Sequence, residues 1–355
     1  MTYPRVSIII LNWNSLKDTS ECLESLQQMD YSNYEVIVVD NGSEGDDVSI
    51  LRERFGDYIH IIENEKNYGF AEGSNIGIRY AFQSSNPDYI LLLNGDTVVD
   101  ADFLMQLVKV AESSDSIGAV QSKLIRKDNP DIIDSAGQAI YADGSVEDIG
   151  IESHDDGRFD TVHEIFGPCA AAALYRSSVL RSIGSFDERF FVTKEDVDLS
   201  WRMRLHGYRA LFVPGSRVYH KRSITRSISP VTSFADVRAY YGRKNCLCLV
   251  IKYYPLSLIL KFLPFLGLSL LVVVYYSLKV DHRGSLMKDL LAALKDRRSS
   301  ALQSVSIREV RRKWIIPKSL TGLYNYNLLR ALRLTGLLLH TWWMYVSKRL
   351  RRGIA

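Results

Sequence analysis

Short apolar runs that end abruptly in polar residues dominate the first third of the chain. Residues 89–93 are five apolar residues in a row, followed by Asn94-Gly95-Asp96. A run of this length is too short for a free helix and is typical of a strand buried on both faces of a parallel sheet. Residues 6–11 and 34–39 have the same form, and residues 19–29 between them have apolar positions at helical spacing. The pattern predicts a β-α-β unit.

The pattern continues to residue 214 and predicts an α/β fold, with a mostly parallel sheet flanked by helices. The further predicted elements are a strand at 59–63, a helix at 101–113, a strand at 118–123, a hairpin of 138–142 and 145–150 with its turn at Asp143-Gly144, and a strand at 208–214. Ligands of such folds bind beyond the carboxyl ends of the strands. Polar residues at these ends are therefore the first candidates for a binding site.

Two predicted strand ends carry carboxylates. Asn94 and Asp96 follow the strand at 89–93. An Asn-x-Asp pair can hold Mg²⁺ or Mn²⁺ through oxygen while the ion bridges substrate phosphates, and a solvated Asx-type turn is the alternative. Asp40 follows the strand at 34–39. It can accept hydrogen bonds from a base or ribose, or it can cap a helix.

Two segments rich in small residues are candidates for close contact with a ligand. Residues 67–77 contain three glycines and predict a helix whose N-terminus is open to a phosphate or sugar oxygen. Their spacing differs from a P-loop and from a Rossmann fingerprint, which disfavours NTPase and dehydrogenase functions. Residues 167–175 are mostly small, and they either pack tightly or line a site.

A second acidic cluster begins a predicted helix. Glu195, Asp196 and Asp198 lie in its first turn, where the helix dipole favours negative charge, and an acidic first turn accounts for Asp198. Glu195 and Asp196 also follow the aromatic pair Phe190-Phe191, a setting that can raise one carboxyl pKa toward that of a general base. Further on, His220 next to two cations is either structural or a ligand.

Seven segments stand in a fixed order along the chain: residues 6–14, 38–43, 67–77, 93–96, 184–191, 195–202 and 218–220. Together they resemble the family 2 inverting glycosyltransferases of GT-A (Rossmann-like) fold, and within them the rhamnosyltransferase-like branch. The resemblance covers roughly residues 5–245, and the ordered set is far more specific than any one motif.

The resemblance implies a donor site for a nucleotide-diphosphate sugar. Asp40 matches the residue that reads the nucleotide base, and Asn12 and Asn75 match groups around the nucleotide sugar. Asn67 and Gly69 belong to the matching loop that approaches the donor. The branch implies dTDP-rhamnose as donor, with UDP- or GDP-sugars as the alternatives.

The resemblance also implies a metal and a base. Asp96 matches the metal-binding acid of the family's Asp-x-Asp motif and His220 a second ligand, which implies Mn²⁺ or Mg²⁺. Asn94 stands where the simplest motif has its first aspartate. Asp196 matches the catalytic base, with Glu195 as the alternative. One base without an enzyme nucleophile predicts a single displacement that inverts the anomeric carbon.

The composition changes toward the C-terminus. The 355 residues are 46% hydrophobic and 24% charged with a net charge of +3, but residues 281–355 hold sixteen Lys and Arg against four Asp and Glu. Residues 255–278 hold one charge, Lys261. They predict a tilted membrane span, a re-entrant or interfacial helix, or a buried helix pair or dimer interface. Basic residues such as Arg308 alternate with aliphatic and aromatic runs, which favours a membrane surface over nucleic acid.

These features predict a glycosyltransferase domain at residues 1–245 and a hydrophobic, basic, helical membrane-association region at residues 246–355. The four cysteines have no metal-site or disulfide spacing, and residues 6–11 are too short for the apolar part of a signal peptide. We therefore expect the protein at the cytoplasmic face of the cell membrane, acting on a lipid-linked saccharide. The alternatives are a polyprenyl-phosphate monosaccharide synthase and a non-catalytic subunit that binds nucleotide sugars.

Overall fold

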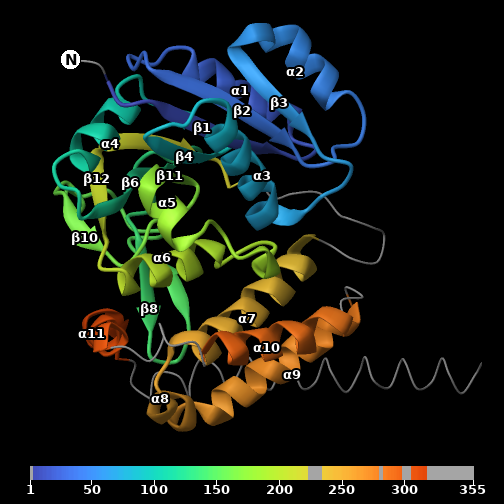
Figure 1. The fold of residues 1–355 in the computed structure, drawn as a ribbon, viewed down its shortest axis with the longest axis vertical. Helices are drawn as coiled ribbons and strands as arrows, with labels where there is room; N and C mark the ends of the chain where they lie inside the picture. Colours follow the sequence, from blue (N-terminus) through green and yellow to red (C-terminus); the bar gives the residue numbers. More distant parts are fainter. Residues whose placement is uncertain (1–2, 223–233, 280–282, 298–304, 318–355) are drawn as a thin grey trace, which may run out of the picture. The chain divides into compact units, whose positions relative to one another are not determined.

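The computed structural model describes residues 3–222, 234–279, 283–297 and 305–317 (Figure 1). The chain forms two compact units: the first comprises Met1–Ile140, Val146–Arg226 and Arg298–Trp314, and the second comprises Tyr141–Ser145, Ser227–Arg297 and Ile315–Ala355. The boundary expected between residues 245 and 246 lies inside one continuous helix, α7 (Phe234–Tyr253). The basic segment around Arg308 belongs to the first unit instead of a C-terminal module.

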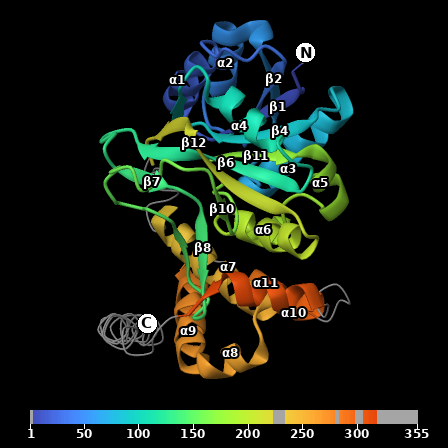
Figure 2. The ribbon, with the colours of Figure 1, turned by 90° about the vertical axis from the view of Figure 1, so that its left-hand side faces the viewer.

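Ten strands in the described part of the chain form the sheet of the first unit. Its path is β10-β12-β6-β11-β4-β1-β2-β3, with β5 beside β12 and β7 beside β6 (Figure 2). The strands are β1 (Val6–Asn12), β2 (Tyr34–Asp40), β3 (Ile59–Glu63), β4 (Tyr89–Asn94), β5 (Thr97–Val99), β6 (Ile117–Arg126), β7 (Ile133–Ser135), β10 (His163–Ile165), β11 (Ala172–Arg176) and β12 (Arg209–His220).

The sheet is mixed: parallel strands, as expected, are joined to antiparallel strands that we did not expect. Strands β3, β2, β1 and β4 are parallel neighbours, and so are β6 and β12. Between these groups, β11 runs antiparallel to both β4 and β6. A buried strand of small and apolar residues has the same composition in either direction, so the sequence of β11 did not reveal its orientation.

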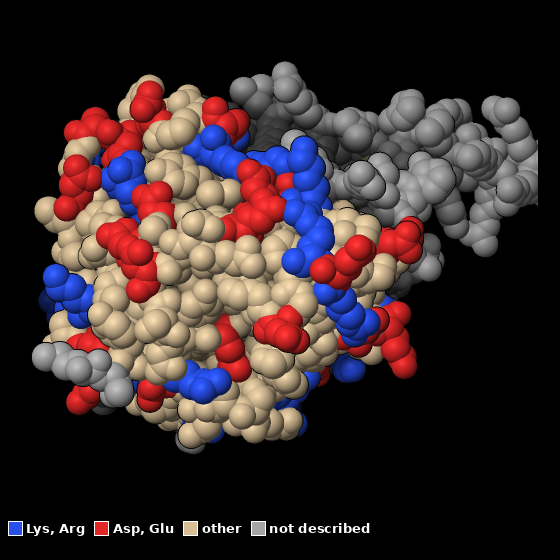
Figure 3. Space-filling view, turned by 90° about the horizontal axis from the view of Figure 1, so that it is seen from above, with Lys and Arg blue, Asp and Glu red and all other residues tan. Residues whose placement is uncertain are grey.

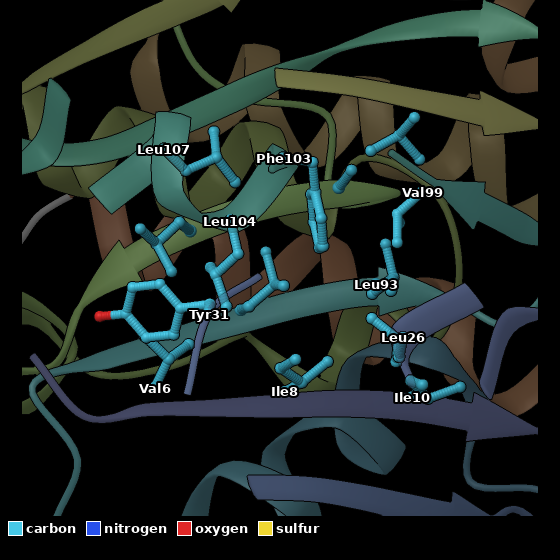
Figure 4. Packing of buried hydrophobic residues seen from close by; sticks show 14 of the residues in the cluster. Val6, Ile8, Ile10, Leu26, Tyr31, Leu93, Val99, Phe103, Leu104 and Leu107 are labelled. Carbon is cyan, nitrogen blue, oxygen red and sulfur yellow. The ribbon is translucent and has the colours of Figure 1, made fainter. Parts of the chain in front are cut away.

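Alternate residues of each strand supply the two faces of the core. In β1, Ile8 and Ile10 lie in one buried cluster with Phe103 and Leu104, whereas Ile9 lies in the cluster on the other face. Figure 4 shows the first cluster, with Ile8 and Ile10 along one strand and Leu93, from a neighbouring strand, next to Phe103. Full burial of such a side chain contributes about 1.5–3 kcal/mol. The two-residue period of the pattern therefore fixes which face each side chain covers.

Helices of the first unit cover both faces of its sheet. Residues of α1, α2 and α4 enter the first cluster, and residues of α3, α5 and α6 enter the second. The helices are α1 (Leu16–Leu26), α2 (Asp47–Phe55), α3 (Gly69–Ser84), α4 (Phe103–Ala111), α5 (Ser177–Ile183), α6 (Glu195–Leu205) and α11 (Val305–Trp314), with short 3-10 turns η1 (Gly56–Tyr58) and η2 (Glu188–Phe190).

Helix α11 packs onto the first unit through its apolar side. Ile307 and Val310 are buried, and the Arg204 guanidinium of α6 lies 4.4 Å from the centre of the Trp314 ring. Lys313 Nζ lies 3.0 Å from Glu164 Oε2. The basic segment that we expected at a membrane surface therefore buries apolar residues and contacts α6 through Trp314.

The expected hairpin at Asp143-Gly144 is present. Strands β8 (Gln138–Tyr141) and β9 (Val146–Asp148) pair antiparallel from Gln138 to Ile140. At the turn, the Ser145 N–H and hydroxyl both donate to Asp143 Oδ1, at 3.0 and 2.7 Å. The hairpin places Gln138 of β8 directly opposite Asp148 of β9.

The second unit is helical, with α7, α8 (Leu256–Lys261), α9 (Leu263–Lys279), α10 (Arg283–Arg297) and the short β13 (Ile315–Ile316). A buried ion pair joins Lys244 Nζ of α7 to Asp289 Oδ2 of α10 at 2.7 Å. The apolar residues 255–278 form two helices that meet at Phe262. Among the described residues, no helix combines the length and apolarity needed to cross a membrane.

Candidate active site

The ends of β1 and β2 hold a buried amide beside a buried carboxylate. The parallel register places Asn12 next to Asp40, and Asn12 Nδ2 donates to Asp40 Oδ2 at 2.7 Å. The Asn12 Oδ1 atom accepts from the Thr19 hydroxyl at 2.7 Å. Asp40 Oδ1 accepts from the Ser43 N–H at 2.9 Å. Asn12 therefore aligns the Asp40 carboxylate, and contact of either residue with a nucleotide stays a prediction.

The loop before α3 is tied to β2 by a second amide, Asn41. Asn41 Nδ2 donates to Asn67 Oδ1 at 3.0 Å, and the same oxygen accepts from the Gly69 N–H at 2.7 Å. A Cβ at Gly69 would lie 2.5 Å from the Phe191 ring, so only glycine fits between α3 and residue 191. Asn67 and Gly69 thus shape the edge of the site. Asn41 was not among the predicted site residues, although it follows Asp40 directly.

Asn75 joins α3 to the chain before α6. Its Nδ2 donates to Phe186 O at 2.9 Å, and its Oδ1 accepts from the Phe186 N–H at 3.0 Å. Nδ2 also lies 3.2 Å from Glu72 Oε2. The Asn75 amide therefore serves the fold here, and its predicted contact with the nucleotide sugar stays a prediction.

The ends of β4 and β12 bring Asp96 and His220 together. Strand β5 pairs with β12 so that His220 lies opposite Thr97, the residue after Asp96. His220 Nε2 lies 3.2 Å from Asp96 Oδ1 and 3.4 Å from Asn94 Nδ2. The three residues that the sequence proposed for metal binding are thus neighbours.

Asp134 is a functional candidate that the sequence did not reveal. Its Oδ2 lies 2.7 Å from His220 Nδ1, and its other oxygen pairs with Arg222. Burial alone would raise the pKa of Asp134, but His220 and Arg222 hold it below its ordinary value. Burial likewise opposes protonation of His220, but its bonds to Asp134 and Asp96 raise the His220 pKa to about 9. Asp134 therefore fixes a proton on Nδ1 and leaves Nε2 facing Asp96.

The donor atoms of Asp96 and His220 suit a divalent cation in part. A carboxylate oxygen and an imidazole nitrogen face each other, and a buried carboxylate orients the imidazole from behind, as is common for metal-binding histidines. Among the described residues, no three His, Cys, Asp or Glu side chains form a group that could hold a metal. Asp96 and His220 could supply two ligands, and ions such as Mg²⁺ commonly take others from phosphates and water.

Asp196 lies at the start of α6 in a closed polar setting and is 6% exposed. Its Oδ2 accepts from Gln138 Nε2 at 2.8 Å and from the Ala170 N–H at 3.3 Å, and its Oδ1 accepts from the Val197 N–H at 2.9 Å. Burial raises the pKa of Asp196, although Lys194 and the hydrogen bonds from Ala170 and Gln138 oppose the shift. A carboxyl with a raised pKa is suited to accept a proton.

The two neighbouring acids differ from Asp196. Glu195 is also buried, at 5% exposure, and remains the alternative base. Asp198 Oδ2 pairs with Arg202 Nε at 3.0 Å one turn along α6, and its side chain is fully buried. Asp198 therefore has the structural function expected of an acidic first turn.

The small residues 167–175 pack tightly against α6. A Cβ at Gly167 would lie 1.9 Å from Ser200 Oγ of α6, so this segment lies directly on the helix. The same closeness allows the Ala170 N–H to reach Asp196. Tight packing, one of the two alternatives that the sequence left open, is thus present, and the lining of a site stays a prediction.

A family model described as "Glycosyltransferase like family 2" matches residues 4–239, about two thirds of the chain. The chain belongs to this family. The match covers the strand ends that carry Asp40, Asp96 and His220 and the helix that carries Asp196. The expected family is therefore confirmed, and the rhamnosyltransferase-like branch stays a prediction.

Two relatives of this family 2 member act on glycans by name. The "Low-salt glycan biosynthesis hexosyltransferase Agl10" of Haloferax volcanii is 26% identical over 203 residues, covering 56% of this chain and 61% of the relative. The "Poly-beta-1,6-N-acetyl-D-glucosamine synthase" of Staphylococcus epidermidis is 23% identical over 210 residues, covering 59% and 48%. The chain thus spans about half to three fifths of the length of these relatives.

A solved structure shares the fold. The crystal structure of GalNAc-T7 with UDP, GalNAc and Mn²⁺ matches with a TM-score of 0.63 at 14% identity, covering 88% of this chain and 57% of that one. The likeness supports the expected GT-A-like α/β fold for this glycosyltransferase family member.

Proposed function

We propose that this protein is an inverting glycosyltransferase that moves a sugar from a nucleoside diphosphate to a hydroxyl of a saccharide acceptor. The observation that carries the proposal is Asp196, a buried carboxyl of raised pKa at the start of α6. This helix packs on the sheet whose strand ends present Asp40 and the Asp96–His220 pair. Membership of glycosyltransferase family 2 supports the same reaction class.

The proposed reaction is a single displacement. The acceptor hydroxyl gives its proton to Asp196, and the hydroxyl oxygen forms a bond to the anomeric carbon. The bond from that carbon to the diphosphate oxygen breaks, and its electron pair leaves with the nucleoside diphosphate. The acceptor attacks the face opposite the leaving group, so the anomeric configuration inverts.

We further propose that Asp96 and His220 hold Mn²⁺ or Mg²⁺ during the reaction. A bound ion would stabilise the charge that develops on the departing diphosphate. Asp134 would keep the imidazole oriented through its Nδ1 contact. Support comes from the facing donor atoms and from the Mn²⁺ in the GalNAc-T7 structure.

Asp40 and Asn12 are proposed to bind the nucleotide end of the donor, with the loop of Asn67 and Gly69 beside them. Asn75 is proposed to take part through the segment that it holds at Phe186. The proposed donor is dTDP-rhamnose, from the branch resemblance alone, with UDP- and GDP-sugars as the other donors to test.

The acceptor is proposed to be lipid-linked and used at the cytoplasmic face of the cell membrane in cell-surface glycan assembly. Support comes from exposed apolar side chains in the second unit, where six of the described leucines are more than half exposed: Leu256, Leu260, Leu263, Leu271, Leu278 and Leu291. Cys22 and Cys169 are thiols, which suits a reducing compartment.

A nucleic-acid partner is not part of the proposal. Figure 3 shows one face of the molecule, on which Lys and Arg are interspersed with Asp and Glu. Proteins that bind a nucleic-acid backbone typically have Lys and Arg clustered into a continuous basic surface.

The experiment is donor turnover by purified protein in detergent. A panel of nucleotide sugars is offered with a polyprenyl-diphosphate saccharide, with Mn²⁺, with Mg²⁺ or with EDTA, and nucleoside diphosphate release is measured. We expect metal-dependent release from one donor and an extended acceptor. Transfer to polyprenyl phosphate itself would instead identify a monosaccharide synthase, and donor binding without any turnover would favour a non-catalytic subunit.

A further inference from the structure

The hydrogen bonds of Asp196 distinguish its two carboxylate oxygens. Oδ2 accepts from Gln138 Nε2 at 2.8 Å and from the Ala170 N–H at 3.3 Å. Oδ1 accepts from the Val197 N–H at 2.9 Å. A carboxylate oxygen offers about two acceptor positions. Among the described residues, Oδ2 therefore has both positions filled, and Oδ1 keeps one for a further donor.

We infer that Gln138 is a positioning residue for the proton transfer, and that Asp196 Oδ1 receives the proton of the acceptor hydroxyl. The inference rests on the proposed function of Asp196. Gln138 acts by holding Oδ2 and stabilising the ionised carboxylate. It does not touch the reacting atoms.

Stability alone does not explain a glutamine at this position. Gln138 is 4% exposed, and its Oε1 is buried without a hydrogen-bond partner in the described part of the protein. A buried amide with an unsatisfied oxygen is costly compared with an apolar side chain of the same shape. Rotation of the amide would place Oε1 against the Asp196 carboxylate, so the observed orientation is the one that serves the carboxylate.

The backbone around Gln138 makes the contact rigid. The Gln138 N–H donates to Gly167 O at 3.0 Å, which joins the start of β8 to the segment that includes Ala170. Gly167 lies against Ser200 of α6, the helix that carries Asp196. The two donors to Oδ2 therefore come from two segments that are hydrogen-bonded to each other, and the segment with Ala170 packs on α6.

Charged groups on the elements around Asp196 shift its pKa in opposite directions. Lys194 before α6 lowers the Asp196 pKa, and Asp148 on β9 raises it. Glu195 precedes Asp196 on the same helix. Burial raises the pKa of Cys169 and of Tyr175 well above their ordinary values, so both are neutral at physiological pH. Gln138 supplies the shortest hydrogen bond to the carboxylate.

The test compares Gln138→Met, which keeps the shape but removes the donor, with Gln138→Glu, which also adds a like charge. A hydrogen bond to an ionised group favours the charged form, so its loss should raise the Asp196 pKa. We expect the acid limb of the kcat/KM profile to move to higher pH, by about one unit for Gln138→Met and further for Gln138→Glu.

Gln121→Met is the matched control. Gln121 is also buried, and its side-chain amide is also hydrogen-bonded, but its partners are Ser135 and Cys169 instead of Asp196. We expect this control to leave the acid limb unchanged. A uniform fall of kcat in Gln138→Met at every pH, with an unmoved acid limb, would overturn the inference and leave Gln138 a structural residue.

A second measurement separates this inference from the proposed function. The carboxyl ¹³C resonance of Asp196, assigned by its loss in Asp196→Asn, is titrated in wild-type protein and in both Gln138 variants. A higher titration midpoint in the variants supports the Gln138–Asp196 coupling even if no donor is turned over. An unchanged midpoint contradicts the coupling even if the wild-type protein is an active transferase.

Discussion

His220 Nε2 lies 3.2 Å from Asp96 Oδ1, although the two residues come from the ends of β12 and β4. The pairing of β5 with β12 produces this contact, and Asp134 holds the opposite side of the imidazole. The relationship joins a strand-end acid to a histidine whose orientation is fixed. It is the geometric basis of the proposed metal function.

We expect Asp134→Asn to weaken Mn²⁺ binding by about 10–100-fold, because outer-shell carboxylates orient metal-binding histidines. The measurement is direct titration with Mn²⁺ by electron paramagnetic resonance, with turnover measured in parallel. His206→Gln is the control, since that imidazole is exposed and contacts Arg202 O. Equal Mn²⁺ affinity in Asp134→Asn and wild type would contradict the assignment of Asp96 and His220 as ligands.

We expect Asp196→Asn to stabilise the protein against heat near neutral pH. Burial raises the folded-state pKa of Asp196, so the stability linked to its protonated form is present at low pH and lost as pH rises through that pKa. Asparagine is neutral throughout. The gain in Tm over wild type should therefore grow from pH 4 to pH 8. A constant gain or a loss that grows with pH would contradict the raised pKa.

We expect Gly69→Ala to cost more stability than Gly45→Ala. Both glycines have left-handed φ angles, +81° and +88°, but an added Cβ meets Phe191 at 2.5 Å only at Gly69 and has open space at Gly45. Both variants therefore have the same conformational cost of a positive φ at alanine. The difference between their losses of unfolding free energy, about 1–3 kcal/mol, measures overpacking against Phe191. Urea unfolding measures it. Equal costs would show that the loop moves away from Phe191 without penalty.

The strand-end residues could be predicted from sequence because the signal is local. A buried strand that stops at Asp40 or Asp96 places its last side chain at the edge of the sheet. Asp134 and Gln138 could not be predicted in this way. Each contacts its proposed partner, His220 or Asp196, from far along the chain, and no local pattern distinguishes them from other polar residues beside apolar ones.

The observed fold differs from the predicted one at β11, for the same reason. The composition of β11 suits either strand direction, so its antiparallel pairing with β4 and β6 was missed. The change in composition near residue 245 predicts a domain boundary, which stays a prediction, and α7 runs through these residues. Long-range pairing, which the sequence pattern does not specify, decided the direction of β11.

We expect Leu260→Ser/Leu271→Ser to reduce binding to anionic liposomes by at least about tenfold, since each leucine contributes about 1.5–3 kcal/mol when it leaves water. Both side chains are 60% exposed on α8 and α9. Val162→Ser, at a 51% exposed position of the first unit, is the control. Vesicle flotation measures the bound fraction. Undiminished binding by the double variant would contradict membrane contact through these helices.

The central claim is that Asp196 is the catalytic base, and one comparison tests it most directly. Sugar transfer and donor affinity are measured for wild type, Asp196→Asn and Glu195→Gln, with the donor that the panel identifies. We expect Asp196→Asn to lose about 10²–10⁴-fold in kcat with donor affinity retained, and Glu195→Gln to keep most of its turnover. Wild-type turnover in Asp196→Asn, or the larger loss in Glu195→Gln, would contradict the claim.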